Sequence, residues 1–185
     1  MAAYNIETAD FSLISSGEIF ILDANILCYL YSGYNLNQRD SVKATKYSNF
    51  ISNLLGNGNK ISTSAAYVQE VLNYIENTEY TLYKQAHPIH YLTKKQFRND
   101  PSFRANVKSK TCSAYSAICQ NCNDVYDVDV TKPIMDRFVN EFQNHVYDPI
   151  DYIVAENLVT NNRINIITDD KDYRNDSRLQ VYTII

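Results

Sequence analysis

Glycine is scarce in this chain, with four residues among 185. Neither G-x-G-x-x-G nor G-x-x-x-x-G-K occurs, which excludes the usual backbone cradles for dinucleotides and nucleoside triphosphates. Long apolar runs are also lacking, since none approaches the ~18 residues that a membrane-spanning helix needs. The first residues lack the charged and apolar regions of a secretory signal. We therefore expect a cytoplasmic protein that is neither exported nor bound to a membrane.

The four cysteines do not form the two close pairs that a structural zinc site requires. Without an export signal, they are expected to be reduced thiols. The spacing of Cys112, Cys119 and Cys122 places them on one face of a helix and predicts a buried stripe.

Length and composition indicate one globular domain. A chain of this size buries roughly 70% of its unfolded surface and needs no disulfides to hold a core. Its content of hydrophobic residues, 45%, and of charged residues, 21%, is ordinary for such a domain. No internal repeat or low-complexity tract interrupts the sequence.

Charge is distributed unevenly along the chain. Residues 84–110 contain seven basic residues and one acidic residue, whereas the formal charge of the whole chain is −4. Aromatic residues are interleaved with these basic groups, a mixture that suits a phosphate backbone with unstacked bases. The alternative is a solvated insertion that uses its charges for solubility. The candidate nucleic-acid ligands are Lys94, Lys95, Arg98 and Arg104.

Short apolar runs alternate with helical patterns. Strands are expected at residues 20–22, 60–63, 126–130, 164–167 and 181–184. Ser64 and Asp148 are placed to cap the helices that follow them. Residues 79–123 are expected to be mostly helical. The alternation predicts an α/β fold in which helices flank a twisted central parallel sheet of about five strands.

Carboxylates follow the expected strands, where parallel sheets bind their ligands. They come from four separate segments: Asp23, Glu70, Asp148, Asp151, Asp169, Asp170 and Asp172. Acids brought together repel and take up protons unless cations keep them ionised. Oxygen ligands suit Mg²⁺ or Mn²⁺, which activate water and neutralise charge on a phosphodiester. Taken one at a time, most of these acids have a structural explanation. Asp148, for example, can serve as a helix cap.

Four segments resemble the motifs of the PIN domain family, in the family's order. Residues 21–27 read I-L-D-A-N-I-L, and residues 61–72 contain I-S-T-S-A-A followed by Q-E-V-L. Residues 151–155 read D-Y-I-V-A, which is similar to the family's D-x-x-I-A. Residues 166–173 read I-I-T-D-D-K-D-Y, which is similar to its T-x-D-x-D-F. The chain thus resembles PIN domains of the VapC-like toxin ribonuclease type.

The resemblance implies a three-layer PIN-like fold that forms one domain over residues 1–185, with a basic insertion at about 79–123. It implies a Mg²⁺- or Mn²⁺-dependent endoribonuclease that hydrolyses RNA and is the toxin of a type II toxin–antitoxin pair. An antitoxin and a second copy of the chain are then the protein partners to consider. The alternatives are a PIN nuclease in RNA processing and a non-catalytic PIN-like scaffold that binds RNA or protein.

The resemblance also implies roles for individual residues. The catalytic metal ligands would be Asp23, Glu70, Asp151 and Asp170, with Asp172 as a supporting ligand. Asn25, Thr168 and Asp148 would be supporting groups. The free position of the closing motif falls on Asp169, which is therefore expected to face solvent. Tyr173 replaces the usual phenylalanine and is expected to serve in packing.

Two other families place an aspartate after a first strand. Haloacid-dehalogenase-type phosphatases need a second aspartate two residues later, where this chain has Asn25. Response-regulator receivers have an early acidic pair and a late lysine, an arrangement that is missing here. A degenerate scaffold would be expected to lose acids, and this chain keeps all four.

Overall fold

The computed structural model describes residues 3–143 and 147–185, and its centre is a parallel sheet with strand order β1-β6-β5-β2-β3-β4. Every neighbouring pair of strands is parallel, which confirms the expected α/β class. The strands are β1 (Tyr4–Asn5), β2 (Ile19–Leu22), β3 (Lys60–Ser64), β4 (Asp124–Tyr126), β5 (Asn165–Ile167) and β6 (Gln180–Thr183).

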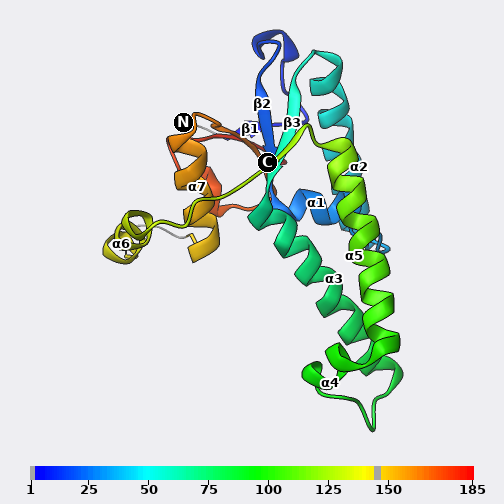
Figure 1. The fold of residues 1–185 in the computed structure, drawn as a ribbon. Coiled ribbons are helices and arrows are strands. Elements are labelled where there is room, and N and C mark those ends of the chain that lie inside the picture. Colours follow the sequence, from blue (N-terminus) through cyan, green and yellow to red (C-terminus); the bar gives the residue numbers. More distant parts are fainter. Residues whose placement is uncertain (1–2, 144–146) are drawn as a thin grey trace.

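Helices cover both faces of the sheet, with α2 on one side and α7 on the other (Figure 1). The α-helices are α1 (Ala24–Tyr31), α2 (Gln38–Gly56), α3 (Ala65–Ala86), α4 (Lys94–Asn99), α5 (Pro101–Asn121), α6 (Lys132–Glu141) and α7 (Pro149–Thr160). Two short 3-10 helices are η1 (Phe11–Leu13) and η2 (Asp172–Asn175). Among the described helices, none is long and apolar enough to pass through a bilayer.

Both expected helix caps are confirmed. The Ser64 side chain accepts a hydrogen bond from the backbone N–H of Tyr67 at the start of α3. The Asp148 side chain accepts bonds from the N–H groups of Ile150 and Asp151 at the start of α7. These bonds satisfy donors that the first helical turn leaves free, and they fix where each helix begins.

Strand β2 lies at the centre of the sheet, between β3 and β5. Phe20, Ile21 and Leu22 are completely buried in the core. The chain proceeds from β2 through β3 to β4 in one direction and later adds β5 and β6 on the other side. The reversal of direction between β2 and β5 is where open parallel sheets form their ligand-binding crevice.

Three expectations about local structure were wrong. The strand expected at 126–130 ends at Tyr126, because the N–H of Asp129 donates to the side chain of Asn157 on α7, away from β3. Strand β1, only two residues long, was not expected, since it is too short to show a period. Of the three cysteines expected in a buried stripe, Cys112 and Cys119 are exposed. The buried face of α5 instead follows Ala114, Ile118 and then Cys122.

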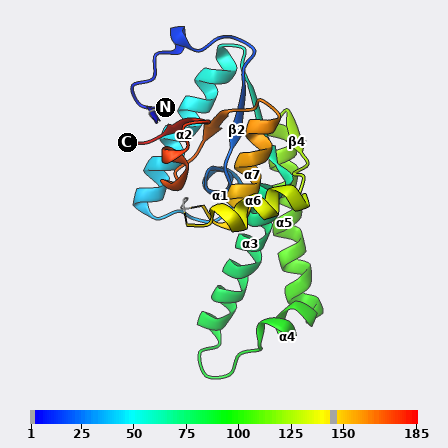
Figure 2. The same cartoon turned by 90° about the vertical axis from the view of Figure 1, so that its left-hand side faces the viewer.

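Residues 76–111 form a helical arm that projects from the body, as Figures 1 and 2 both show. The arm consists of the second half of α3, all of α4 and the first half of α5, with α3 packed along α5. Its far end holds an aromatic cluster in which the ring centroids of Phe97 and Phe103 are 4.8 Å apart and those of Tyr83 and Phe103 4.6 Å. Phe97 is buried there, outside the main hydrophobic core.

Candidate functional site

Asp23 is the most deeply buried acid at the carboxyl edge of the sheet. It follows β2 directly, and its backbone N–H donates to the carbonyl of Ile167 at 3.1 Å, which ties the end of β2 to β5. Its carboxylate accepts a hydrogen bond from the Thr168 hydroxyl at 2.5 Å and a longer one from the Asn25 amide at 3.4 Å. The pairing of two central strands therefore fixes this carboxylate, and Thr168 and Asn25, two of the groups expected to support it, both donate to it.

Thr168 also orders the loop that follows β5. Its hydroxyl oxygen accepts the backbone N–H of Asp170 at 2.8 Å while the same hydroxyl donates to Asp23. The carboxylate of Asp170 in turn accepts the N–H of Asp172 at 2.9 Å. One side chain thus links the buried acid on β2 to the backbone that carries Asp170.

Asp151, in the first turn of α7, is held by a chain of two tyrosines. The Tyr173 hydroxyl donates to the Asp151 carboxylate at 2.8 Å, and the hydroxyls of Tyr67 and Tyr173 are 2.5 Å apart. Both tyrosines are buried. Tyr173 was expected only to pack, and Tyr67 was not singled out from the sequence. No local sequence pattern shows which polar group each hydroxyl meets.

Burial raises the pKa values of three of these acids. The pKa of Asp23 is raised to about 6, with a contribution from the charge of Asp170. The pKa of Glu70, half-buried in the second turn of α3, is raised to about 7, with contributions from Asp23 and Asp148. Burial and the charges of Asp148, Asp23 and Glu70 raise the pKa of Asp151 to about 8. These five acids therefore share one electrostatic environment.

None of the described cationic side chains neutralises these acids. Within the described ranges, no lysine, arginine or histidine forms an ion pair with any of the six predicted site acids: Asp23, Glu70, Asp148, Asp151, Asp170 and Asp172. Asp148 is exposed, and Asp170 and Asp172 are partly exposed. The carboxyl edge of the sheet is therefore an acidic surface, and Asp23 is buried beneath it.

The pKa of Asp151 makes stability dependent on pH. Because its pKa is higher in the folded chain than in the unfolded one, the folded chain binds more protons between about pH 4 and 8. In EDTA, the contribution of Asp151 to the free energy of unfolding should therefore fall as the pH rises from about 4 to about 8. Asp151→Asn keeps an oxygen for Tyr173 and removes the charge, so its melting temperature should exceed that of wild type by several degrees at pH 8.

Thermal unfolding followed by circular dichroism in EDTA, from pH 5 to pH 8.5, would measure this difference. The advantage of the variant should shrink toward pH 5, where the wild-type carboxyl is largely protonated in the folded chain. A variant that is less stable than wild type at every pH would contradict the raised pKa.

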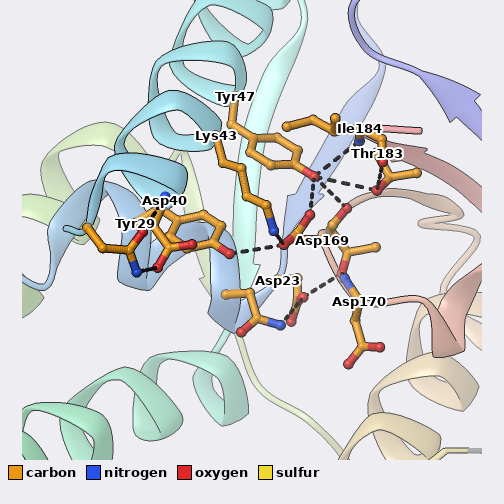
Figure 3. Close-up of polar contacts among 12 residues, drawn as sticks. Asp23, Tyr29, Asp40, Lys43, Tyr47, Asp169, Asp170, Thr183 and Ile184 are labelled. Carbon is orange, nitrogen blue, oxygen red and sulfur yellow. Dashed lines mark hydrogen bonds and ion pairs between the residues drawn. The ribbon is translucent and has the colours of Figure 1, made fainter.

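Asp169 does not face solvent as expected. Its carboxylate accepts the Tyr29 hydroxyl at 3.0 Å and forms an ion pair with Lys43, and the Tyr47 hydroxyl lies 3.3 Å from it (Figure 3). Its side chain is only 15% exposed. These contacts come from α1 and α2, whereas Asp170 points away from them. The motif alone could not reveal partners that lie more than 120 residues away in sequence.

The donor chemistry of the acidic group fits a hard divalent cation. Every candidate ligand is a carboxylate, and the group contains no positive charge that a metal would have to displace. In the described part of the chain, however, no three or more Asp, Glu, His or Cys side chains are arranged to hold a metal ion as they stand. A cation would therefore have to draw these carboxylates closer together.

The predicted nucleic-acid ligands lie elsewhere, at the far end of the arm (Figure 2). Lys94, Lys95 and Arg98 are in α4, and Arg104 is in the first turn of α5. Arg98 makes two hydrogen bonds of 2.5 Å to Glu76, and Lys94 is 3.8 Å from the same carboxylate. Lys95 and Arg104 are exposed and form no ion pair with a described residue. The structure does not bring these four residues to the acidic group.

No protein-family model matches this chain, and no curated protein sequence matches it. Its fold is similar to one chain in the crystal structure of VapBC2 from Rickettsia felis bound to a DNA fragment from the promoter of that pair. The two chains share 15% sequence identity with a TM-score of 0.50, and the match covers 88% of this chain and 96% of the other. This likeness confirms the expected PIN-like fold.

Proposed function

We propose that this PIN-like chain is a metal-dependent endoribonuclease and the toxin of a type II toxin–antitoxin pair. The observation that carries the proposal is the acidic group itself. Burial and the charges of neighbouring acids raise the pKa values of Asp23, Glu70 and Asp151, and no cation among the described residues is paired with them. A fold keeps such an unfavourable arrangement where a function needs it.

In this proposal, Asp23, Glu70, Asp151 and Asp170 hold Mg²⁺ or Mn²⁺, with Asp172 as a supporting ligand. The bound metal supplies an activated water and neutralises charge on the phosphodiester. The chain's own residues hold the ligands in place. Thr168 and Asn25 donate to Asp23, and Tyr173 donates to Asp151. Asp148 caps the amino end of α7, and the first turn of that helix carries Asp151.

Incubation of the purified chain with labelled single-stranded and structured RNAs tests the activity. Cleavage with Mg²⁺ or Mn²⁺ that stops in EDTA would support the nuclease. Binding without cleavage in every metal would favour the non-catalytic scaffold.

A nuclease of RNA processing would also cut RNA, so co-expression with neighbouring genes is needed to reveal an inhibitory antitoxin. Light scattering would show whether the chain is a homodimer, and cell fractionation would test the proposed cytoplasmic location.

RNA contact by the arm gives a separate prediction. Because Glu76 already binds Lys94 and Arg98, Lys95 and Arg104 are the residues in this group left to meet phosphates. Replacing both by glutamine should weaken binding of single-stranded RNA. It should also reduce the slope of log affinity against log salt by about 1.4, at about 0.7 for each lost phosphate contact. Filter binding at several salt concentrations measures that slope.

The matched control is Lys60→Gln at the amino end of β3, on the opposite edge of the sheet from the acids. Its salt slope should equal that of wild type. Should the Lys95/Arg104 variant also keep the wild-type slope, the arm is a solvated insertion and does not bind RNA.

A further inference from the structure

A cavity of about 470 Å³ opens beside the acidic group, between the first turns of α3, the segment after β4 and the start of α7. Its walls are largely apolar and include Val128, Val130, Ile150 and Ile153. Two of these side chains are well exposed, Val130 at 66% and Ile150 at 44%. A volume in this range suits a small organic group the size of a nucleoside.

Polar groups line one side of the same cavity. Gln69 and Asn73 are four residues apart and therefore lie on one face of α3, and Asp127 lies across from them after β4. Both amide side chains are exposed, and neither makes a hydrogen bond with any residue that the structure describes. Each amide offers a donor and an acceptor side by side, which is the pattern that base edges present.

Glu70 connects the cavity to the acidic group. It lines the cavity, and its charge acts on Asp151 while that of Asp23 acts on it. A ligand that reaches the acids at one end would therefore place its neighbouring part in the cavity. In an RNA strand, the part next to a phosphate is a ribose with its base.

We propose that this cavity, the base pocket, binds the nucleobase next to the scissile phosphate and selects it through Gln69 and Asn73. This inference rests on the proposed nuclease function. The apolar walls would contact the faces of the base, and the two amides would pair with its edge. Asp127 gives the pocket wall negative charge, which disfavours a phosphate there and favours an uncharged base.

The test uses short RNAs in which each position is varied in turn, cleaved by the full chain with Mn²⁺. Wild type should prefer one base beside the cut by about tenfold or more, the discrimination expected of one good amide–base pair. The double variant Gln69→Ala/Asn73→Ala should lose that preference while keeping its melting temperature. Gln85→Ala, an exposed amide near the far end of the same helix, is the matched control and should retain it.

Base preference can also be measured without cleavage, as the affinity of Asp23→Asn for the same RNAs in EDTA. A base preference there that the double variant abolishes would support the pocket even if wild type proved unable to cut. An equal base preference in wild type and double variant would overturn the pocket while leaving the nuclease intact. The pocket would also be overturned if the double variant kept its base preference and lost affinity only for a protein partner.

Discussion

Asp23→Asn is expected to lower the rate of RNA cleavage by at least ~10²-fold, the scale of losing one strong electrostatic stabiliser in an active site. Asp23 is buried at the end of the central strand, and its position is set by backbone pairing with β5 and by Thr168. Neighbouring side chains cannot easily move to replace it. Asparagine keeps the shape and an oxygen acceptor for Thr168 but removes the charge that a divalent cation needs.

Cleavage is measured as initial rates over a range of Mn²⁺ concentrations, so that weaker metal binding is separated from slower chemistry. The matched control is Asp136→Asn on α6, whose carboxylate makes an exposed pair with Lys132. Such surface pairs contribute little, so the control should cut at the wild-type rate. The metal mechanism would be refuted if Asp23→Asn cleaved RNA at the wild-type rate, or if cleavage by wild type persisted in EDTA.

The second large effect separates two adjacent acids, Asp169 and Asp170. Asp170→Asn should reduce both Mn²⁺ affinity and cleavage, by about 10²-fold in rate, with little loss of stability, because its carboxylate pairs with no cation among the described residues. Asp169→Asn should act in the opposite way. It leaves the Lys43 ammonium without its carboxylate in a partly buried site, so it should lower the melting temperature and leave Mn²⁺ affinity within a few-fold of wild type.

Asp172→Asn should fall between these variants in cleavage, because Asp172 lies close enough to Asp170 for that charge to help raise its pKa. Lys43→Met is the partner test for Asp169. If the ion pair is the main role of Asp169, the double variant should be less destabilised than the sum of the two single variants. If a Mn²⁺ titration showed that Asp169→Asn loses the most metal affinity of the three acid variants, Asp169 would be the ligand in place of Asp170.

Much of the fold could be predicted from local sequence. The apolar runs before Asp23 and Thr168 are strands, and Ser64 and Asp148 cap the helices that follow them. These features depend on short-range chemistry, which periodicity and capping preferences reveal directly. The placement of acids at one edge then followed from the rule that parallel strands end on the same side.

The partners of individual side chains could not be predicted in this way. Lys43 and Tyr29 reach Asp169 from helices more than 120 residues earlier, and Glu76 binds Arg98 across the turn of the arm. Such contacts depend on how elements pack, which no local pattern encodes. The count of basic residues in the arm was correct, but a charge count does not show that Glu76 already pairs with two of them.

The hydrogen bond between Thr168 and Asp23 spans 145 residues, which has a consequence for the order of synthesis. A growing chain contains Asp23 and Glu70 well before it contains β5, the strand that lies beside β2 and leads into Thr168, and Asp151 is also made before that strand. Contacts this distant in sequence form late, because a long loop must close first. A ribosome-bound chain that has not yet released residues 165–170 therefore carries three of the acids without the strand that fixes Asp23. The acidic group is completed only once β5 has formed beside β2.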